Sequence, residues 1–184
     1  MPTDNSYNER DTESDQRFDA LVEAHYAGLF RFAMTLTRAE DDASDLVQET
    51  FLTWATKGGQ LRDQSKARTW LFTTLHRHFL ETQRRKVRRP QVELEEAEQE
   101  LDAVVPELAD RLDAAQLVEM LAQLDEQYRA AVVLFYLEES SYEAIAEVLQ
   151  IPLGTVKSRI SRGISQLKNL VLQAARLAER TRRQ

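Results

Sequence analysis

The stretch "SYEAIAEVLQIPLGTVKSRISRG", residues 141–163, decides the fold of the second half of the chain. Its first part has the apolar spacing of a short helix, in which the small Ala146 permits close crossing by a neighbour. The short connector "QIPLG" follows, and Gly154 stands just before a new helix that is expected to begin near Thr155. Two helices joined by so short a turn predict a helix-turn-helix.

The helix that begins near Thr155 has two unlike faces. At about 100° per residue, apolar side chains such as Val156 and Ile160 fall on one side. Hydroxyl and cationic side chains fall on the other, where arginine can read guanine and the shorter groups can hold phosphates. The alternative is an ordinary amphipathic helix with a solvated basic face. The expected DNA contacts are Thr155, Lys157, Ser158, Arg159, Arg162 and Gln166.

The net charge of −7 conceals a strong charge pattern along the chain. Residues 61–89 have a local charge of +7, and residues 151–184 also have +7. Between them, residues 90–110 have −8 and residues 111–150 have −6. A uniformly acidic chain would repel nucleic acid, whereas this pattern allows binding at two separate places.

Several classes of protein and site are excluded or disfavoured by the sequence. The chain has no cysteine, which excludes disulfides and thiolate metal sites. His76 and His78 lie about 200° apart on a helix and cannot share a metal ion from one face. Neither a glycine-rich phosphate loop nor a nucleophile motif is present. We therefore expect no enzyme activity, no cofactor and no metal site.

The sequence also favours a cytoplasmic protein. The N-terminal stretch "MPTDNSYNERDTESDQR" is polar and acidic and has no apolar segment of a targeting signal. The longest apolar run, residues 130–137, is too short to span a bilayer. No membrane insertion is expected.

The expected fold class is all-α, as two small helical bundles joined by an acidic linker. Apolar residues recur at spacings of three and four through most of the chain, and only five glycines and four prolines interrupt them. The predicted organisation is a disordered acidic tail (1–17), a first bundle (18–89), the linker (90–110) and a second bundle with a C-terminal helical extension (111–184).

Four segments resemble the extracytoplasmic-function (ECF) sigma factors, the small bacterial transcription initiation subunits. "SYEAIAEVLQIPLGTVKSRISRG" looks like region 4.2, and "LAQLDEQYRAAVVLFYLEESSYEAIAEVL" resembles the part of region 4 that leads into it. "DDASDLVQETFLTWA" resembles region 2.2, and "KARTWLFTTLHRHFLETQRRKVRR" resembles regions 2.3 and 2.4. The resemblance covers nearly all of residues 18–168, in the family's order. It implies a sigma region 2 domain over 18–89 and a sigma region 4 domain over 111–184.

The resemblance implies a factor that binds core RNA polymerase and directs it to promoters. The recognition helix would read the −35 element, and the basic helix of region 2 would bind the −10 element and help to melt the DNA. The residues that this assigns to melting are Arg77, His78, Arg84, Arg85, Lys86 and Arg88. Those that it assigns to the β′ subunit of the polymerase are Asp45, Gln48 and Glu49.

Two aromatic residues, the acidic linker and the C-terminal extension each allow two interpretations. Trp70 and Phe72 could stack on unpaired bases, but core packing is favoured for both. The acidic linker would thread into the polymerase as a mimic of nucleic acid, or it is a plain solvated tether. The apolar stripe of the C-terminal helical extension could pack on region 4, or it could bind an inhibitor. The resemblance supports the second possibility, because family members are commonly held inactive by an anti-sigma factor.

The sequence departs from the family pattern in both halves. His78 and the pair Glu81–Thr82 stand where an asparagine and an isoleucine–aspartate pair are common, which leaves the −10 preference open. Ser161 stands where a larger or aromatic residue is common. Gly163 stands where alanine is common, and close approach to DNA or to a neighbouring helix would account for it.

Three rival functions stay open on the sequence. A stand-alone helix-turn-helix regulator would bind a palindromic operator without polymerase, with the first bundle as a sensor or dimerisation domain. A protein adaptor would keep only the protein contacts. A helical enzyme is disfavoured because no polar catalytic cluster is visible.

Overall fold

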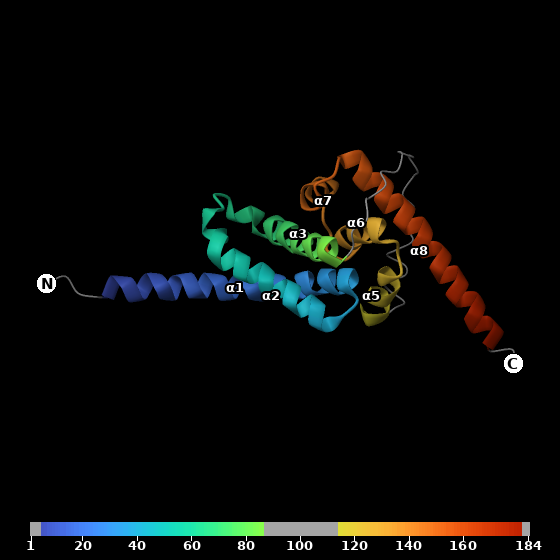
Figure 1. Ribbon diagram of the computed structural model, residues 1–184, viewed down its shortest axis with the longest axis horizontal. Helices are drawn as coiled ribbons and strands as arrows, with labels where there is room; N and C mark the ends of the chain where they lie inside the picture. The colour runs from blue at the N-terminus through green and yellow to red at the C-terminus, as the bar shows by residue number, and fades with distance from the viewer. Residues whose placement is uncertain (1–4, 87–113, 182–184) are drawn as a thin grey trace.

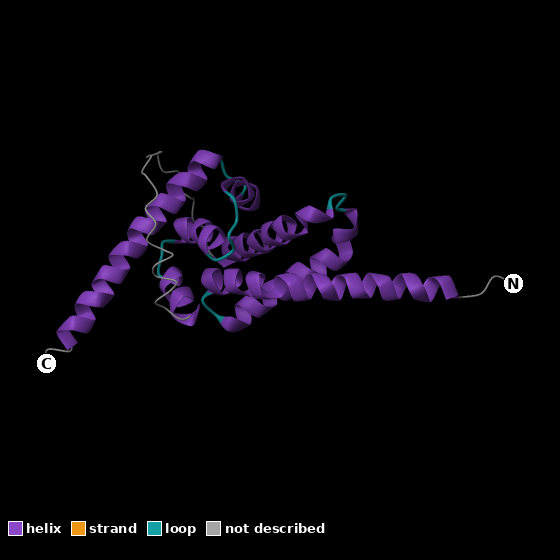
Figure 2. Cartoon of the chain, turned by 180° about the vertical axis from the view of Figure 1, so that it is seen from behind, coloured by secondary structure: helices purple, strands orange, loops and turns teal. Residues whose placement is uncertain are grey.

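The structure is a computed structural model that describes residues 5–86 and 114–181, with side chains for residues 15–84 and 118–173. All of its regular elements in these ranges are helices, which confirms the all-α prediction (Figures 1 and 2). The predicted linker, residues 90–110, lies outside the described residues. The elements are α1 (Asn5–Thr37), α2 (Glu40–Lys57), η1 (Gly58–Gln60), η2 (Gln64–Lys66), α3 (Ala67–Lys86), α5 (Ala114–Ala122), α6 (Glu126–Tyr136), α7 (Tyr142–Leu149) and α8 (Leu153–Thr181).

Helices α1, α2 and α3 pack on one another and form the N-terminal module. Phe32 of α1 and Leu71 of α3 are fully buried between them, with Val47 of α2. The ring centroids of Phe32 and Phe72 lie 5.6 Å apart. Helix α2 ends as predicted at the glycine pair, where Gly58 packs directly on the indole of Trp54.

Helix α1 begins earlier than the sequence predicts. The first residues were expected to form a disordered tail to residue 17, but the helix extends back to Asn5 and projects beyond the module (Figure 1). Extending a helix that is already nucleated adds one hydrogen bond for each residue ordered. The polar residues of this segment therefore continue the helix that packing initiates further along.

Helices α5 to α8 form the C-terminal module, in which α6 contacts both α7 and α8. Either Ser140 or Ser141 could cap α7, and the structure uses Ser141, whose Oγ accepts the Ala144 N–H at 3.2 Å. Gln150 ends α7 in the left-handed conformation, with φ 56°. Helix α8 begins at Leu153 rather than near Thr155, because the carbonyl of Pro152 accepts the Val156 N–H and closes a turn earlier.

Gly163 lies where α8 crosses α6. A Cβ at this position would stand 2.4 Å from Cγ2 of Val132 and 3.2 Å from Cβ of Tyr128. The glycine therefore permits the close approach of the two helices, which was one of the two explanations that the sequence left open. Its cost in helix propensity, about 1 kcal/mol, is offset by this packing.

Gly163→Ala is expected to lower the free energy of unfolding by about 1–2 kcal/mol. Overpacking a tight helix contact typically costs about 1–3 kcal/mol, and the gain in helix propensity returns part of it. Urea denaturation followed by circular dichroism measures the change. Gly59→Ala is the control, because a Cβ there meets nothing within 4 Å. Equal stability of the two variants would contradict the role assigned to Gly163.

The two modules contact each other directly. Helix α1 contacts α5 and α6, and α3 contacts α7, as the views from front and behind agree (Figures 1 and 2). Buried apolar residues of both modules form one continuous cluster. Among residues 5–86 and 114–181, no helix combines the length and apolar character that a membrane crossing requires.

Candidate nucleic-acid interface

The predicted recognition helix is the N-terminal half of α8. Val156 and Ile160 are fully buried on its inner side. Lys157 is exposed, and Thr155 and Ser158 are half-buried. The Ser158 hydroxyl donates to the Thr155 carbonyl at 3.1 Å, which fixes its position on the helix. Packing of the predicted apolar face therefore leaves Lys157 accessible to a phosphate.

Gln166 and Arg159 of the predicted DNA-binding set are influenced by other elements of the protein. The side-chain carbonyl of Gln166 accepts the N–H of Asp125, at the start of α6, at 3.0 Å. Arg159 is half-buried, and burial lowers the pKa of its guanidinium. Burial, together with the nearby Arg159 cation, lowers the pKa of His76 to about 4. Because His76 belongs to α3, the charge of a predicted base-reading residue acts on the other module.

The basic end of α3 presents a second candidate surface. Arg77 and Arg84 are exposed, so both can attract phosphates. His78 is instead held by α2: its Nδ1 lies 3.3 Å from Oε1 of Glu49, and its Nε2 lies 3.1 Å from Oγ1 of Thr53. The side chains of Arg85 and Lys86, and all of Arg88, lie outside the described residues.

The outward face of α2 combines acidic residues with an exposed apolar residue. Asp45, Gln48 and Glu49 are exposed, as their predicted polymerase contact requires. Leu52, which the sequence reasoning missed, is 67% exposed. It lies one turn after Gln48 and Glu49, so its i+3 and i+4 spacing is the signal that could have found it. This face, Asp45–Gln48–Glu49–Leu52, is called the α2 face below.

A groove separates the α2 face from the end of α3. Its volume is about 220 Å³, and its floor includes Leu46 and Phe79. Carboxylates of α2 and polar side chains of α3 form its walls. Two of the predicted polymerase contacts, Asp45 and Glu49, therefore line this groove. The other lining residues are Thr37, Asp42, Asp45, Glu49, Thr82 and Gln83.

The aromatic residues considered as stacking platforms belong to the core. Phe72 is 2% exposed. Trp70 is half-buried and packs edge-on against Trp54, with ring centroids 5.1 Å apart. Both therefore take the core-packing role that the sequence favoured. Within the described ranges, no group of three or more histidine, aspartate or glutamate side chains is arranged to hold a metal ion.

Comparison with known families matches both modules in order. Residues 21–89 match the family described as Sigma-70 region 2. Residues 114–167 match the family described as Sigma-70, region 4. The two matches correspond to the N-terminal module and to the C-terminal module up to the middle of α8.

Curated relatives align with both modules. The chain is 34% identical over 157 residues to the ECF RNA polymerase sigma factor SigL of Mycobacterium tuberculosis, covering 84% of this chain and 88% of SigL. It is 35% identical over 159 residues to the ECF RNA polymerase sigma factor SigE of Mycolicibacterium smegmatis, covering 83% of this chain and 60% of SigE.

Solved structures share the fold. The sigma factor RpoE of Bartonella quintana, solved with the anti-sigma factor NepR, has a TM-score of 0.63 and 27% identity, over 86% of this chain and 96% of RpoE. CnrH, solved with the cytosolic domain of CnrY, has a TM-score of 0.62 and 25% identity, over 85% of this chain and 88% of CnrH. With both regions matched in order and relatives above 30% identity, the chain belongs to the sigma-70 family, as one of its extracytoplasmic-function (ECF) sigma factors.

Proposed function

We propose that this chain is a cytoplasmic transcription initiation factor that binds core RNA polymerase and directs it to promoters. The observation that carries the proposal is the ordered pair of sigma regions, each with a cationic surface of its own. Synthesis of RNA belongs to the polymerase, and this chain supplies recognition. An anti-sigma factor is the proposed regulator, since RpoE was solved with one.

The −35 duplex is assigned to the exposed and half-buried polar residues of α8. Lys157, Thr155 and Ser158 are placed to hold phosphates, and the guanidinium of Arg159 or Arg162 can contact a guanine edge bidentately. The proposed −10 contact is the end of α3, where cations attract the backbone of the separated strand. Each module is small, so its own affinity for DNA is expected to be low without polymerase.

The polymerase contact is assigned to the α2 face. Its three polar residues would form the rim of the contact with the β′ subunit, and Leu52 would be the apolar anchor at its centre. A leucine exposed in the free protein gains about 1.5–3 kcal/mol when a partner buries it fully. An exposed apolar side chain among carboxylates and amides therefore suits a protein partner better than it suits DNA, which the carboxylates would repel.

Leu52→Ala is expected to weaken binding to core polymerase by roughly tenfold or more, because the anchor loses most of its buried area. Binding of the purified chain to surface-immobilised core polymerase measures this change in affinity. Leu172→Ala is the matched control: Leu172 is also exposed, at 55%, but lies on α8 beyond both family matches. Equal loss in the two variants would contradict a specific contact at Leu52.

Run-off transcription with purified core polymerase on a promoter library tests the proposed function as a whole. Specific transcripts are expected only when the chain is added. Tight binding of the chain alone to a palindromic operator, without promoter opening, would instead support a stand-alone regulator. Failure to associate with core polymerase would contradict the proposal.

A further inference from the structure

One buried carboxylate stands between the two modules. Glu138 lies in the connection from α6 to α7, and its side chain is 5% exposed. A carboxylate withdrawn from water to this extent is strongly destabilising unless cations and hydrogen bonds compensate it. The partners of Glu138 therefore contribute to the stability of this junction together with the apolar cluster that the modules share.

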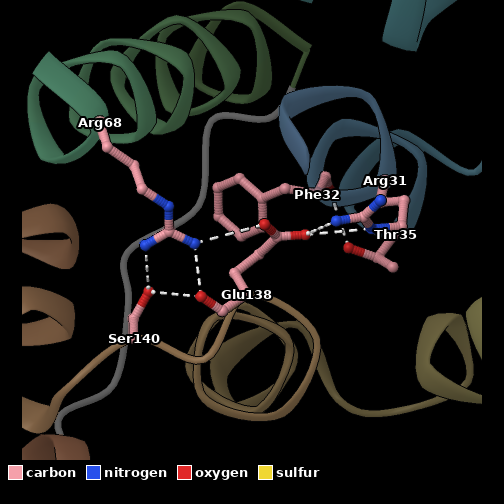
Figure 3. A network of polar contacts seen from close by, with 6 residues as sticks. All are labelled: Arg31, Phe32, Thr35, Arg68, Glu138 and Ser140. Carbon is pink, nitrogen blue, oxygen red and sulfur yellow. Dashed lines mark hydrogen bonds and ion pairs between the residues drawn. The ribbon is translucent and has the colours of Figure 1, made fainter. Parts of the chain in front are cut away.

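Both cationic partners of Glu138 come from the N-terminal module (Figure 3). Arg31 of α1 donates from Nε and Nη2 to Oε1, at 3.2 and 3.0 Å. Arg68 of α3 donates to Oε2 at 3.4 Å and to the backbone carbonyl of Glu138. Its other nitrogen, Nη1, donates to Oγ of Ser140 at 3.1 Å. The N-terminal module thus holds both the side chain and the backbone of this connection.

The shapes of the two modules also fit at Glu138. A Cβ on Gly28 of α1 would stand 2.6 Å from Oε2 of Glu138, so a larger residue there would displace the carboxylate from its present position. The guanidinium of Arg68 lies over the ring of Phe72, with Cζ 5.0 Å from the centroid. Cation and aromatic ring at this distance attract each other and orient the guanidinium toward Glu138.

The two arginine side chains that bind Glu138 are partly exposed to solvent. The side chains of Arg31 and Arg68 are 42% and 38% exposed, so solvent and salt screen their attraction for Glu138. When the modules separate, water can solvate all three charges, and the apolar cluster shared by the modules then provides the remaining attraction between them. Breaking the ion pairs therefore weakens the contact between the modules without removing a buried partner from the core of either one.

The same closed arrangement places the N-terminal module against the helix-turn-helix. Helix α3 packs on α7, the first helix of that motif, and Arg159 of α8 is half-buried. Lys157, on the same helix, is exposed. Closure therefore holds the N-terminal module beside the motif that would dock on duplex DNA, which limits docking on any sequence.

We propose that Glu138 is the latch of a closed, self-inhibited form of this chain, in which the N-terminal module, packed on α7, limits docking of the helix-turn-helix on DNA. Release of Glu138 from Arg31 and Arg68 weakens this packing and allows the helix-turn-helix to dock. The latch stands on the contacts alone, whereas its effect on DNA reading rests on the proposed function.

The distance between the modules tests the latch. Because the chain has no native cysteine, Ala55→Cys on α2 and Glu147→Cys on α7 give two unique, exposed sites for spin labels. Pulsed electron–electron double resonance is expected to give one narrow distribution of the distance between the two labels in the otherwise unchanged chain. Glu138→Arg places a third cation beside two arginines and is expected to give a longer, broader distribution.

Two further variants make this measurement decisive. Glu139→Arg changes the charge at the neighbouring exposed residue and is expected to keep the narrow distribution. Arg31→Glu combined with Glu138→Arg restores an opposite-charge pair and is expected to recover the shorter distance, which a merely misfolded Glu138→Arg protein would not do. An unchanged distribution in Glu138→Arg, or the same shift in Glu139→Arg, would overturn the latch.

A separate measurement tests the effect on DNA. Glu138→Gln and Glu139→Gln remove the same charge, so they raise general attraction for DNA equally. With a pool of random-sequence duplex DNA, Glu138→Gln is expected to bind about tenfold more tightly than Glu139→Gln, since affinity rises with the fraction of open molecules. Opened distances with equal DNA binding would show that the latch exists but does not limit DNA access, which overturns self-inhibition alone.

Discussion

Acidification from about pH 7 to about pH 4.5 is expected to lower the free energy of unfolding by about 2–3 kcal/mol through His76 alone. Burial, with the Arg159 cation nearby, lowers the pKa of His76 from 6.5 to about 4 in the folded protein. Between these two values the unfolded chain binds a proton that the folded chain does not. The contribution of His76 to the free energy of unfolding is therefore fully present above about pH 6.5 and declines as the pH falls toward 4. Below pH 4 this contribution changes little.

His76→Gln removes the titrating group and isolates its contribution. Urea denaturation at a series of pH values is expected to show a shallower loss of stability in this variant than in the unchanged chain. The carboxylates titrate in both proteins and cancel in the comparison. His25 acts in the same direction, because burial and then Arg68 lower its pKa. Identical pH profiles for His76→Gln and the unchanged chain would contradict the burial of His76 in solution.

Local signals predicted the helices and the helix-turn-helix correctly. The cap of α7, the end of α2 at Gly58 and the buried stripe at Val156 and Ile160 all depend on residues within a turn or two of one another. Periodicity and capping chemistry record such contacts directly. The early start of α1 was missed because helix extension from a packed segment leaves no apolar pattern in the extension itself.

Contacts between distant segments were not predictable from one sequence. Glu138 meets Arg68 and Arg31 across 70 and 107 residues, and a glutamate after a helix looks like any solvated charge. Gln166 was assigned to DNA from its place on the helical wheel, yet it accepts a hydrogen bond from Asp125, 41 residues away. His78 and Glu49 were assigned to different partners, and the packing of α2 on α3 joins them.

Arg159→Ala is expected to cost about 1–3 kcal/mol of promoter affinity at particular base pairs of the −35 element and little at the others. A guanidinium that contacts one base edge discriminates between bases, whereas a phosphate contact does not. Lys157→Ala is the matched control: this exposed cation lies on the same helix and is expected to weaken all sequences alike. Holoenzyme binding to a library of single-base promoter variants measures both patterns.

The electrostatic effect of Arg159 on His76 provides a second, independent readout for the same variant. Its cation contributes to the low pKa of His76, so Arg159→Ala is expected to raise that pKa in the free chain, while Lys157→Ala leaves it unchanged. Titration of the histidine ring signals by nuclear magnetic resonance measures this shift. A raised His76 pKa together with an equal loss of affinity for all promoter variants would support the electrostatic effect of Arg159 on His76. It would assign Arg159 to the phosphate backbone rather than to a base edge. An unchanged pKa with base-specific loss would support its reading role and contradict an electrostatic effect of Arg159 on His76. Because the same cation would act on His76 in the free chain and on a base edge in the promoter complex, both effects together would mean that Arg159 changes surroundings when the chain binds the promoter.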